Sequence, residues 1–169
     1  MFSNIFIYFF KLKIWYYNDE GVSTMRLTLY TDYSLRVLLY LASTNKDEKL
    51  VQIKDVAESY NISKNHLMKV IYHLGKLGYI ETIRGRGGGI RLAMEPSSIN
   101  IGKLVRHTEE DFHIVDCFGD QSACVITPVC SLKHVLQKAL QAFIQVLDEY
   151  TLEDLLHNKE ELASMLKVD

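Results

Sequence analysis

The stretch Asn61-Ile-Ser-Lys-Asn-His-Leu-Met-Lys-Val-Ile-Tyr-His-Leu-Gly75 decides the fold of this chain of 169 residues. Its apolar residues recur at the i, i+3, i+4 and i+7 positions that share one face of a helix: Leu67, Val70, Ile71 and Leu74. Ser63 stands where an N-cap residue is expected, and the helix is predicted to run to Gly75 or Leu77. The opposite face of this helix is polar and carries lysine, asparagine and histidine side chains.

A second helix is predicted directly before this stretch, near 52–60, because Ile53, Val56 and Ala57 fall on one face. Two helices joined by a short turn, the second with a polar exposed face, are typical of a helix-turn-helix that enters the DNA major groove. We therefore predict a helix-turn-helix over about residues 52–75. Its candidate contacts to phosphates or base edges are Ser63, Lys64, Asn65, His66 and Lys69.

A Gly- and Arg-rich segment follows, Arg84-Gly-Arg-Gly-Gly-Gly89, between two short β-like segments at 79–83 and 90–93. Glycines allow a tight hairpin tip, and the arginines supply positive charge. A phosphate-binding P-loop is excluded, because no Gly-Lys-Ser/Thr sequence and no following helix are present. The pattern instead predicts a wing that lies along a minor groove, with candidate contacts at Arg84, Arg86, Gly87 and Gly88.

The chain before the helix-turn-helix contains one further predicted helix, from Asp32 to about Ser43, with Thr31 as its N-cap residue. Residues 1–24 fit neither a membrane span, since their apolar run is far shorter than about 20 residues, nor a signal peptide, since they lack a basic start. We expect translation to start at Met25, so that residues 1–24 are an extension absent from the native protein.

The net charge of −2 hides a marked asymmetry. Residues 26–94 contain eleven lysines and arginines against six acidic residues, whereas residues 95–169 contain six against thirteen. A basic half joined to an acidic half fits a chain with one lobe that faces DNA and one that faces away. The odd number of cysteines and the lack of a secretory signal predict a cytoplasmic protein without a membrane partner.

The acidic half is predicted to form a short helix at 99–108 and a long helix from about Ser131 to Tyr150. Apolar residues recur along the long helix at alternating spacings of four and three: Leu132, Leu136, Ala139, Phe143, Val146 and Tyr150. Val135, Leu140 and Leu147 widen this seam beyond what one small domain is expected to cover. The seam predicts a two-fold homodimer, the alternative being that it packs only onto its own chain. Two capping motifs predict short terminal helices: Thr151-x-x-Asp154 and Asn158-x-x-Glu161.

All three cysteines of the chain, Cys117, Cys124 and Cys130, lie within fourteen residues. Thiolates clustered in this way bind soft partners, and three interpretations follow from the spacing: an iron–sulfur cluster, tetrahedral zinc with His134 as fourth ligand, or a bare thiol switch. The spacings lack the short Cys-x2-4-Cys knuckles typical of structural zinc. Spacing alone, however, gives nearly equal support to the three interpretations.

Four sequence motifs resemble the nitric-oxide-sensitive repressors among the Rrf2-type winged-helix regulators. They are Tyr30-Thr-Asp-Tyr-Ser-Leu-Arg-Val37, Ile62-Ser-Lys-Asn-His-Leu-Met-Lys-Val70, Arg84-Gly-Arg-Gly-Gly-Gly-Ile-Arg-Leu92 and Cys117 with Cys124-Val-Ile-Thr-Pro-Val-Cys130. The resemblance covers residues 25 to about 166 and favours the iron–sulfur interpretation. It implies a homodimer with one cluster per subunit, 4Fe-4S rather than 2Fe-2S, held by the three cysteines and by Asp32 of the partner subunit. His134 is the reserve ligand, and Arg36, one helical turn after Asp32, is expected to orient that carboxylate.

The predicted function is a DNA-binding transcriptional repressor that binds a double-stranded operator and releases it when nitric oxide destroys the cluster. An iron-status or redox-responsive regulator on the same scaffold is the main alternative, and a structural zinc protein is another. We predict no enzymatic activity, because no nucleophile–base constellation accompanies the cysteines.

The predicted fold is mainly α: a winged helix-turn-helix domain followed by a long C-terminal dimerisation helix. The expected organisation is an N-terminal extension at 1–24, the DNA-binding domain at 25–108, a cysteine loop at 109–130, and the dimerisation and terminal helices at 131–169.

Overall fold

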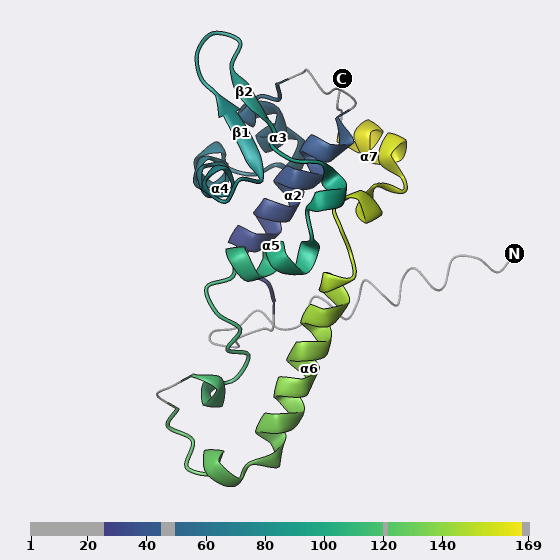
Figure 1. Cartoon of the computed structure of the whole chain (residues 1–169). Coiled ribbons are helices and arrows are strands. Elements are labelled where there is room, and N and C mark those ends of the chain that lie inside the picture. The colour runs from purple at the N-terminus through teal and green to yellow at the C-terminus, as the bar shows by residue number, and fades with distance from the viewer. Residues whose placement is uncertain (1–25, 45–49, 120–121, 167–169) are drawn as a thin grey trace, which may run out of the picture.

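The computed structural model describes residues 26–44, 50–119 and 122–166 (Figure 1). The proposed start at Met25 and the extension before it lie outside the described residues. The described elements follow in chain order: α2 (Leu29–Ser43), α3 (Ile53–Tyr60), α4 (Lys64–Lys76), β1 (Ile80–Ile83), β2 (Gly89–Leu92), η1 (Pro96–Ser98), α5 (Ile101–Thr108), η2 (Asp116–Phe118), η3 (Thr127–Val129), α6 (Ser131–Asp148), η4 (Glu153–Leu156) and α7 (Lys159–Met165). The mainly helical fold with one small hairpin is the predicted one.

The first described helix, α2, begins three residues earlier than predicted, and the assignment of Thr31 as its N-cap was wrong. Thr28 is the N-cap, and its hydroxyl accepts a hydrogen bond from the Thr31 N–H at 3.2 Å. Thr31 is instead completely buried, and its hydroxyl donates to the hydroxyl of Thr108 at 2.9 Å. The partner of Thr31 is therefore 77 residues away, which a local capping pattern does not reveal.

The helix-turn-helix is confirmed, with α3 and α4 joined by a turn at Asn61–Ser63. Asn61 adopts the left-handed conformation, with φ 53°, which ends α3 and redirects the chain. The four apolar residues predicted for the inner face of α4 are all buried. Ser63 occupies the N-cap position but makes no side-chain cap hydrogen bond.

The wing is a two-stranded antiparallel hairpin in which Ile80 pairs with Leu92 and Ile83 pairs with Gly89. Gly85 and Gly87 in its tip have positive φ angles of 102° and 80°, which favour glycine. Val51 forms an antiparallel bridge with Ile90, which fixes the hairpin to the chain just before α3.

The hydrophobic core surrounds α2, which lies in the middle of the body of the molecule (Figure 1). Val37 and Leu38 of α2 are fully buried together with Leu67 and Leu74 of α4 and Leu104 of α5. Burial of such side chains stabilises the fold by about 1.5–3 kcal/mol each. The core therefore fixes α4 relative to α2 and α5.

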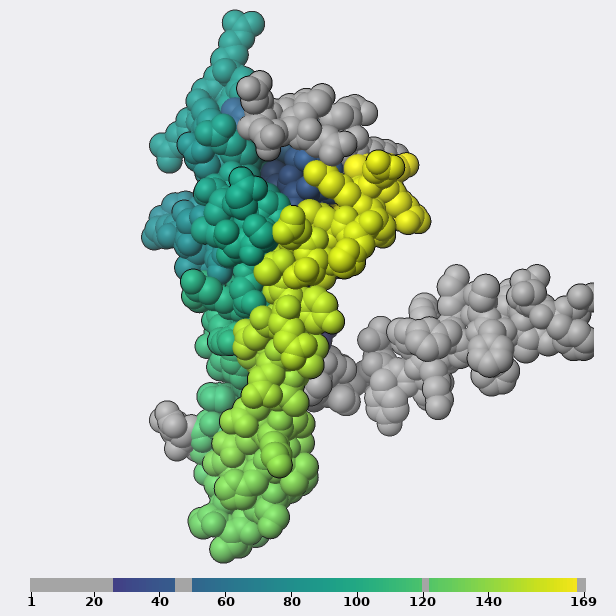
Figure 2. Space-filling model, turned by 45° about the vertical axis from the view of Figure 1, so that its right-hand side comes forward, coloured from purple at the N-terminus to yellow at the C-terminus, as the bar shows by residue number. Residues whose placement is uncertain are grey.

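The cysteine-bearing loop after α5 runs away from this body, and the long helix α6 runs beside it back toward the body (Figures 1 and 2). Figure 2 shows the two as a narrow column below the body. The chain returns to the body after α6, where Thr151 and Asp154 form the predicted capping box. Asn158 precedes α7 but makes no side-chain cap hydrogen bond. No helix in the described ranges is long and apolar enough to cross a membrane.

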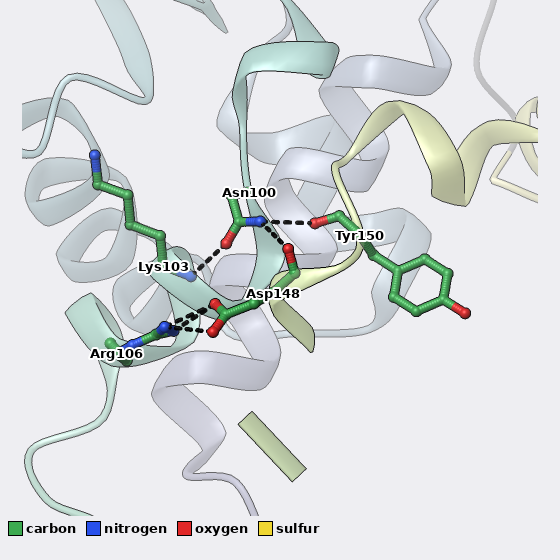
Figure 3. A network of polar contacts seen from close by, with 5 residues as sticks. All are labelled: Asn100, Lys103, Arg106, Asp148 and Tyr150. Atoms are coloured by element: carbon green, nitrogen blue, oxygen red, sulfur yellow. Dashed lines mark hydrogen bonds and ion pairs between the residues drawn. The ribbon is translucent and has the colours of Figure 1, made fainter. Parts of the chain in front are cut away.

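A network of polar contacts joins the C-terminal end of α6 to α5 (Figure 3). Both terminal nitrogens of Arg106 donate to the Asp148 carboxylate at 2.6–2.7 Å. The side-chain amide of Asn100 donates to the carbonyls of Asp148 and Tyr150 at 2.7 and 3.3 Å, while its oxygen caps α5 at the Lys103 N–H. These contacts make the column and the body one continuous structure.

Gly102 lies where α5 and α6 approach most closely, so Gly102→Ala is expected to destabilise the protein by about 1–3 kcal/mol. A Cβ at this position would lie 2.1 Å from a carboxylate oxygen and 2.9 Å from the backbone nitrogen of Asp148, so α6 must shift. Gly75→Ala in α4 is the matched control, because its Cβ would meet nothing closer than 3.8 Å. Chemical denaturation should show Gly75→Ala unchanged or more stable, by up to about 1 kcal/mol. Equal stability of Gly102→Ala and the wild type would contradict the tight junction.

Candidate DNA-reading surface and cysteine loop

The outer face of α4 is exposed, as a DNA-reading helix requires. The five candidates at its N-terminal end all lie on the surface: Ser63, Lys64, Asn65, His66 and Lys69. The ring of His66 stacks on Tyr33 of α2, with centroids 6.5 Å apart. Further along this face, Lys76 lies 4.8 Å from the centroid of the Tyr72 ring, a cation–π contact that adds an exposed aromatic group to the surface.

The tip of the wing projects above the body and presents Arg84, Arg86 and Gly87 to solvent (Figure 1). Gly88 is required for space, because an added Cβ would lie 2.2 Å from the carbonyl oxygen of Ile83. The side-chain amide of Gln52 donates to the Gly88 carbonyl and so ties the wing to the start of α3. Sequence reasoning missed Gln52, since its partner is 36 residues away.

Asp32 and Arg36 form a two-point ion pair on α2, with N–O distances of 3.0 and 2.9 Å. The hydrogen bond to Asp32 raises the pKa of Arg36. The guanidinium also lies over the ring of Tyr60, 5.6 Å from its centroid. Burial raises the pKa of Tyr60 to about 12, a rise that the nearby Arg36 partly opposes. Because Tyr60 is the last residue of α3, this chain of contacts links Asp32 to the turn of the helix-turn-helix.

The three cysteines lie in the segment that connects α5 to α6, and all three are free thiols. Cys117 is in η2, Cys124 lies before η3, and Cys130 is the N-cap residue of α6. Apolar side chains beside them face solvent in the single chain, with Val125 92% and Val129 82% exposed. A pocket of about 360 Å³ separates the start of this segment from α6, and Phe112, Phe118 and Leu140 are among its lining residues.

The donor chemistry of this loop fits an iron–sulfur cluster, because three thiols are the ligands that such clusters need. Among the residues that the structure describes, however, no three His, Cys, Asp or Glu side chains are gathered into a metal-binding group. His134 is exposed on the first turn of α6. Asp32 belongs to α2 in the body, whereas the loop lies along the far half of α6 (Figure 1). Within one chain the structure therefore does not bring Asp32 to the cysteines.

The first residues of the loop are nonetheless tied to the helix that carries Asp32. A carboxylate oxygen of Glu109 accepts hydrogen bonds from the N–H and the hydroxyl of Thr28 at 2.8 and 3.1 Å. Next to it, the hydroxyl of Thr108 accepts from Thr31 and donates within α5 to the Leu104 carbonyl. A displacement of the loop at Glu109 thus acts directly on the N-terminus of α2.

One face of α6 is apolar and exposed in the single chain. Five side chains on this face or just after the helix have exposed fractions between 41 and 62%: Leu132, Val135, Phe143, Val146 and Tyr150. Leu147 was expected to widen this face, but it packs together with Ile144 against the core of its own chain. The reason is helical geometry, since Leu147 lies about 100° around the helix from Val146. Contiguous exposed apolar surface of this kind is typical of interaction sites.

Comparison with known proteins agrees with this architecture. Residues 27–158 match the family model described as "Rrf2: Iron-dependent Transcriptional regulator". The chain is 63% identical over 145 residues to the HTH-type transcriptional regulator NsrR of Bacillus subtilis, covering 85% of this chain and 99% of that protein. It is 62% identical over 143 residues to the NsrR of Bacillus licheniformis, with 84% and 99% covered.

Two solved structures show the same fold. T. potens IscR superimposes with a TM-score of 0.64 at 28% identity, covering 83% of this chain and 93% of that chain. CymR of B. subtilis, described as the global cysteine regulator, superimposes with a TM-score of 0.59 at 26% identity, covering 78% and 96%. The chain belongs to the Rrf2 family of DNA-binding transcriptional regulators.

Proposed function

We propose that this regulator is a homodimeric repressor that holds an iron–sulfur cluster and releases its operator when nitric oxide destroys that cluster. The observation that carries the proposal is the position of the three-cysteine loop, which begins at the Glu109 contact with the N-terminus of α2 and ends at the exposed face of α6. The high identity to regulators named NsrR and the iron-dependent family description support it.

Cys117, Cys124 and Cys130 would supply three ligands, and the fourth would be Asp32 of the partner subunit, with His134 as the reserve. When bound, an iron–sulfur cluster, 4Fe-4S being favoured, supplies iron atoms that react with nitric oxide. A carboxylate is a hard ligand on a site otherwise made of soft thiolates, so the Asp32 corner is the weakest. Arg36 already holds this carboxylate at two points and would aim it outward from α2.

The contacts of Asp32 offer a route from the loop to DNA. Arg36 contacts both Asp32 and the ring of Tyr60, which ends α3 immediately before the turn into α4. In the same chain, Glu109 at the start of the loop holds the first turn of α2. Opening of the loop would therefore release α2 both at its contact with Glu109 and at Asp32. This release would change the angle at which α4 is presented to DNA.

The apolar face of α6 would bring two copies together along a two-fold axis. Each recognition helix α4 would then enter one of two major grooves about 34–36 Å apart, on a palindromic operator. The exposed arginines of the wing would lie along the adjacent minor grooves.

The alternative is a regulator that reports iron availability, which the iron-dependent description of the family favours. The two functions are distinguished by adding nitric oxide, an iron chelator or a mild oxidant separately to anaerobically purified protein and measuring operator affinity after each. Release by nitric oxide at stoichiometric concentrations supports the proposal. Release only by the chelator supports the alternative, and a colourless zinc-loaded protein would contradict both.

Lys69→Ala tests the DNA-reading surface. If the exposed Lys69 ammonium contacts a phosphate, the variant should bind operator and unrelated DNA about tenfold more weakly, the contribution of one charged hydrogen bond of about 1.5 kcal/mol. The slope of log affinity against log salt should also fall by about 1. Lys138→Ala, exposed on α6, removes the same charge away from α4 and should change neither. Unchanged DNA binding by Lys69→Ala would show that Lys69 does not contact DNA.

A further inference from the structure

The segment that carries the cysteines contains a chain of side-chain hydrogen bonds that the proposed function leaves unexplained. One carboxylate oxygen of Asp116 accepts from the hydroxyl of Ser122 at 3.2 Å and from the N–H of Ala123 at 3.3 Å. Asp116 immediately precedes Cys117, and Ala123 immediately precedes Cys124. The carboxylate therefore connects the residue before Cys117 to the two residues before Cys124.

Ser122 and Thr127 extend this connection toward the third cysteine. The hydroxyl oxygen of Ser122 accepts from the N–H of Cys124 at 3.2 Å and lies 3.4 Å from the hydroxyl oxygen of Thr127. The hydroxyl of Thr127 donates to the Cys124 carbonyl at 2.8 Å. Thr127 opens η3, which ends one residue before Cys130. Each cysteine is thus next to, or within three residues of, a member of the chain.

The protons of this chain can be assigned without conflict. Ser122 has one hydroxyl proton, which goes to Asp116 because the carboxylate is the charged and therefore the stronger acceptor. The proton of Thr127 goes to the Cys124 carbonyl, and the Cys124 N–H goes to Ser122. Neither hydroxyl then donates to the other, so Thr127 is joined to Ser122 through the backbone of Cys124. Among the described residues, no lysine, arginine or histidine forms an ion pair with Asp116. The hydrogen bonds of the Asp116 carboxylate are thus made to groups of the loop itself.

We propose that Asp116 is a positioning residue that orders the metal-free loop around its cysteines by binding Ser122 and Ala123. The three thiols are not gathered in the described loop, so binding of an iron–sulfur cluster must still bring them together. A loop that is already partly ordered by hydrogen bonds loses less conformational entropy on binding than an open one. The role of Asp116 in cluster binding rests on the proposed function, whereas its role in ordering the loop does not. Asp116 is not itself one of the proposed ligands, and its carboxylate bonds to Ser122 and Ala123.

The first test measures loop order in iron-free protein by amide hydrogen exchange over residues 117–130. Asp116→Ala should speed exchange of the Ala123 and Cys124 amides about three- to tenfold, as expected for the loss of one or two exposed hydrogen bonds. Asp116→Asn, which keeps an oxygen acceptor, should restore most of the protection. Asp111→Ala is the matched control: it removes an acidic side chain of the same loop whose carboxylate contacts the N–H and the ring of His113 and bonds to neither Ser122 nor Ala123.

The second test measures iron release from anaerobically loaded protein to a chelator, with the visible spectrum recorded in parallel. Asp116→Ala should lose iron about three- to tenfold faster, Asp116→Asn should lie near the wild type, and Asp111→Ala should match the wild type. Equal amide exchange in Asp116→Ala and wild type, or the same acceleration in Asp111→Ala, would overturn the positioning role. Faster exchange with unchanged iron release would overturn its relevance to the metal centre. Protein that binds no iron–sulfur cluster would contradict the proposed function. The role of Asp116 in loop order would then be tested by amide hydrogen exchange alone.

Discussion

Cys124→Ala should abolish the visible chromophore of the anaerobically purified protein and reduce operator affinity about 10³-fold, to the level of non-specific DNA binding. Cys124 lies in the middle of the loop, and removal of its sulfur leaves at most two thiols, too few for a cluster that needs thiolate ligands at its irons. The same result is expected for Cys117→Ala and Cys130→Ala. Dimerisation should persist in all three variants, because the apolar face of α6 is untouched.

Ser131→Ala is the matched control, since Ser131 directly follows Cys130, is exposed and carries no ligating group. It should retain both the chromophore and operator affinity. Iron and sulfide analysis, visible absorption and electrophoretic mobility shifts measure these properties together. A Cys124→Ala protein that still binds operator with wild-type affinity would show that DNA binding does not depend on the cysteines. This result would contradict the proposed sensor function.

Val146→Glu should convert the proposed dimer to a monomer. Val146 is 53% exposed on the apolar face of α6, near the C-terminal end of the helix, and the proposed two-fold contact would bury the introduced carboxylate. An uncompensated buried charge costs several kcal/mol, so the dimer dissociation constant should rise at least about 100-fold. Operator binding should weaken strongly, because one subunit reaches only one half-site.

Gln145→Glu introduces the same charge one residue earlier, at an exposed position about 100° around the helix. It should leave the dimer intact. Sedimentation velocity of both variants measures the association, and circular dichroism checks that both remain folded. A Val146→Glu protein that sediments as a dimer at low micromolar concentration would place the interface elsewhere.

The helix-turn-helix could be predicted from the sequence because its signals are local. The four buried residues of α4 repeat with the period of a helix, and the left-handed Asn61 lies where the turn was expected. The Gly- and Arg-rich tip likewise predicted the wing without reference to any other part of the chain. The same locality explains the predicted pairing of Asp32 with Arg36, which are one turn apart on one helix.

Contacts between distant segments could not be predicted in this way. Thr31 had the side chain of an N-cap residue, yet it is buried against Thr108. Leu147 was expected to widen the exposed seam, yet it packs against the core of its own chain. The ion pair of Arg106 with Asp148 spans 42 residues and has no local sequence signal. For the candidate site, the sequence identified the three thiols and their loop, whereas the contacts of Glu109 and Asp116 required coordinates. The fourth ligand stays a prediction.

The most direct test of whether nitric oxide releases the operator through the cluster is a nitric oxide titration of anaerobically purified protein. Visible absorption and operator binding are recorded on the same samples. We expect a brown chromophore that bleaches over the first few equivalents of nitric oxide per chain while operator affinity falls in parallel. A chromophore that bleaches while operator affinity stays constant would contradict the claim that the cysteine loop controls the recognition helices.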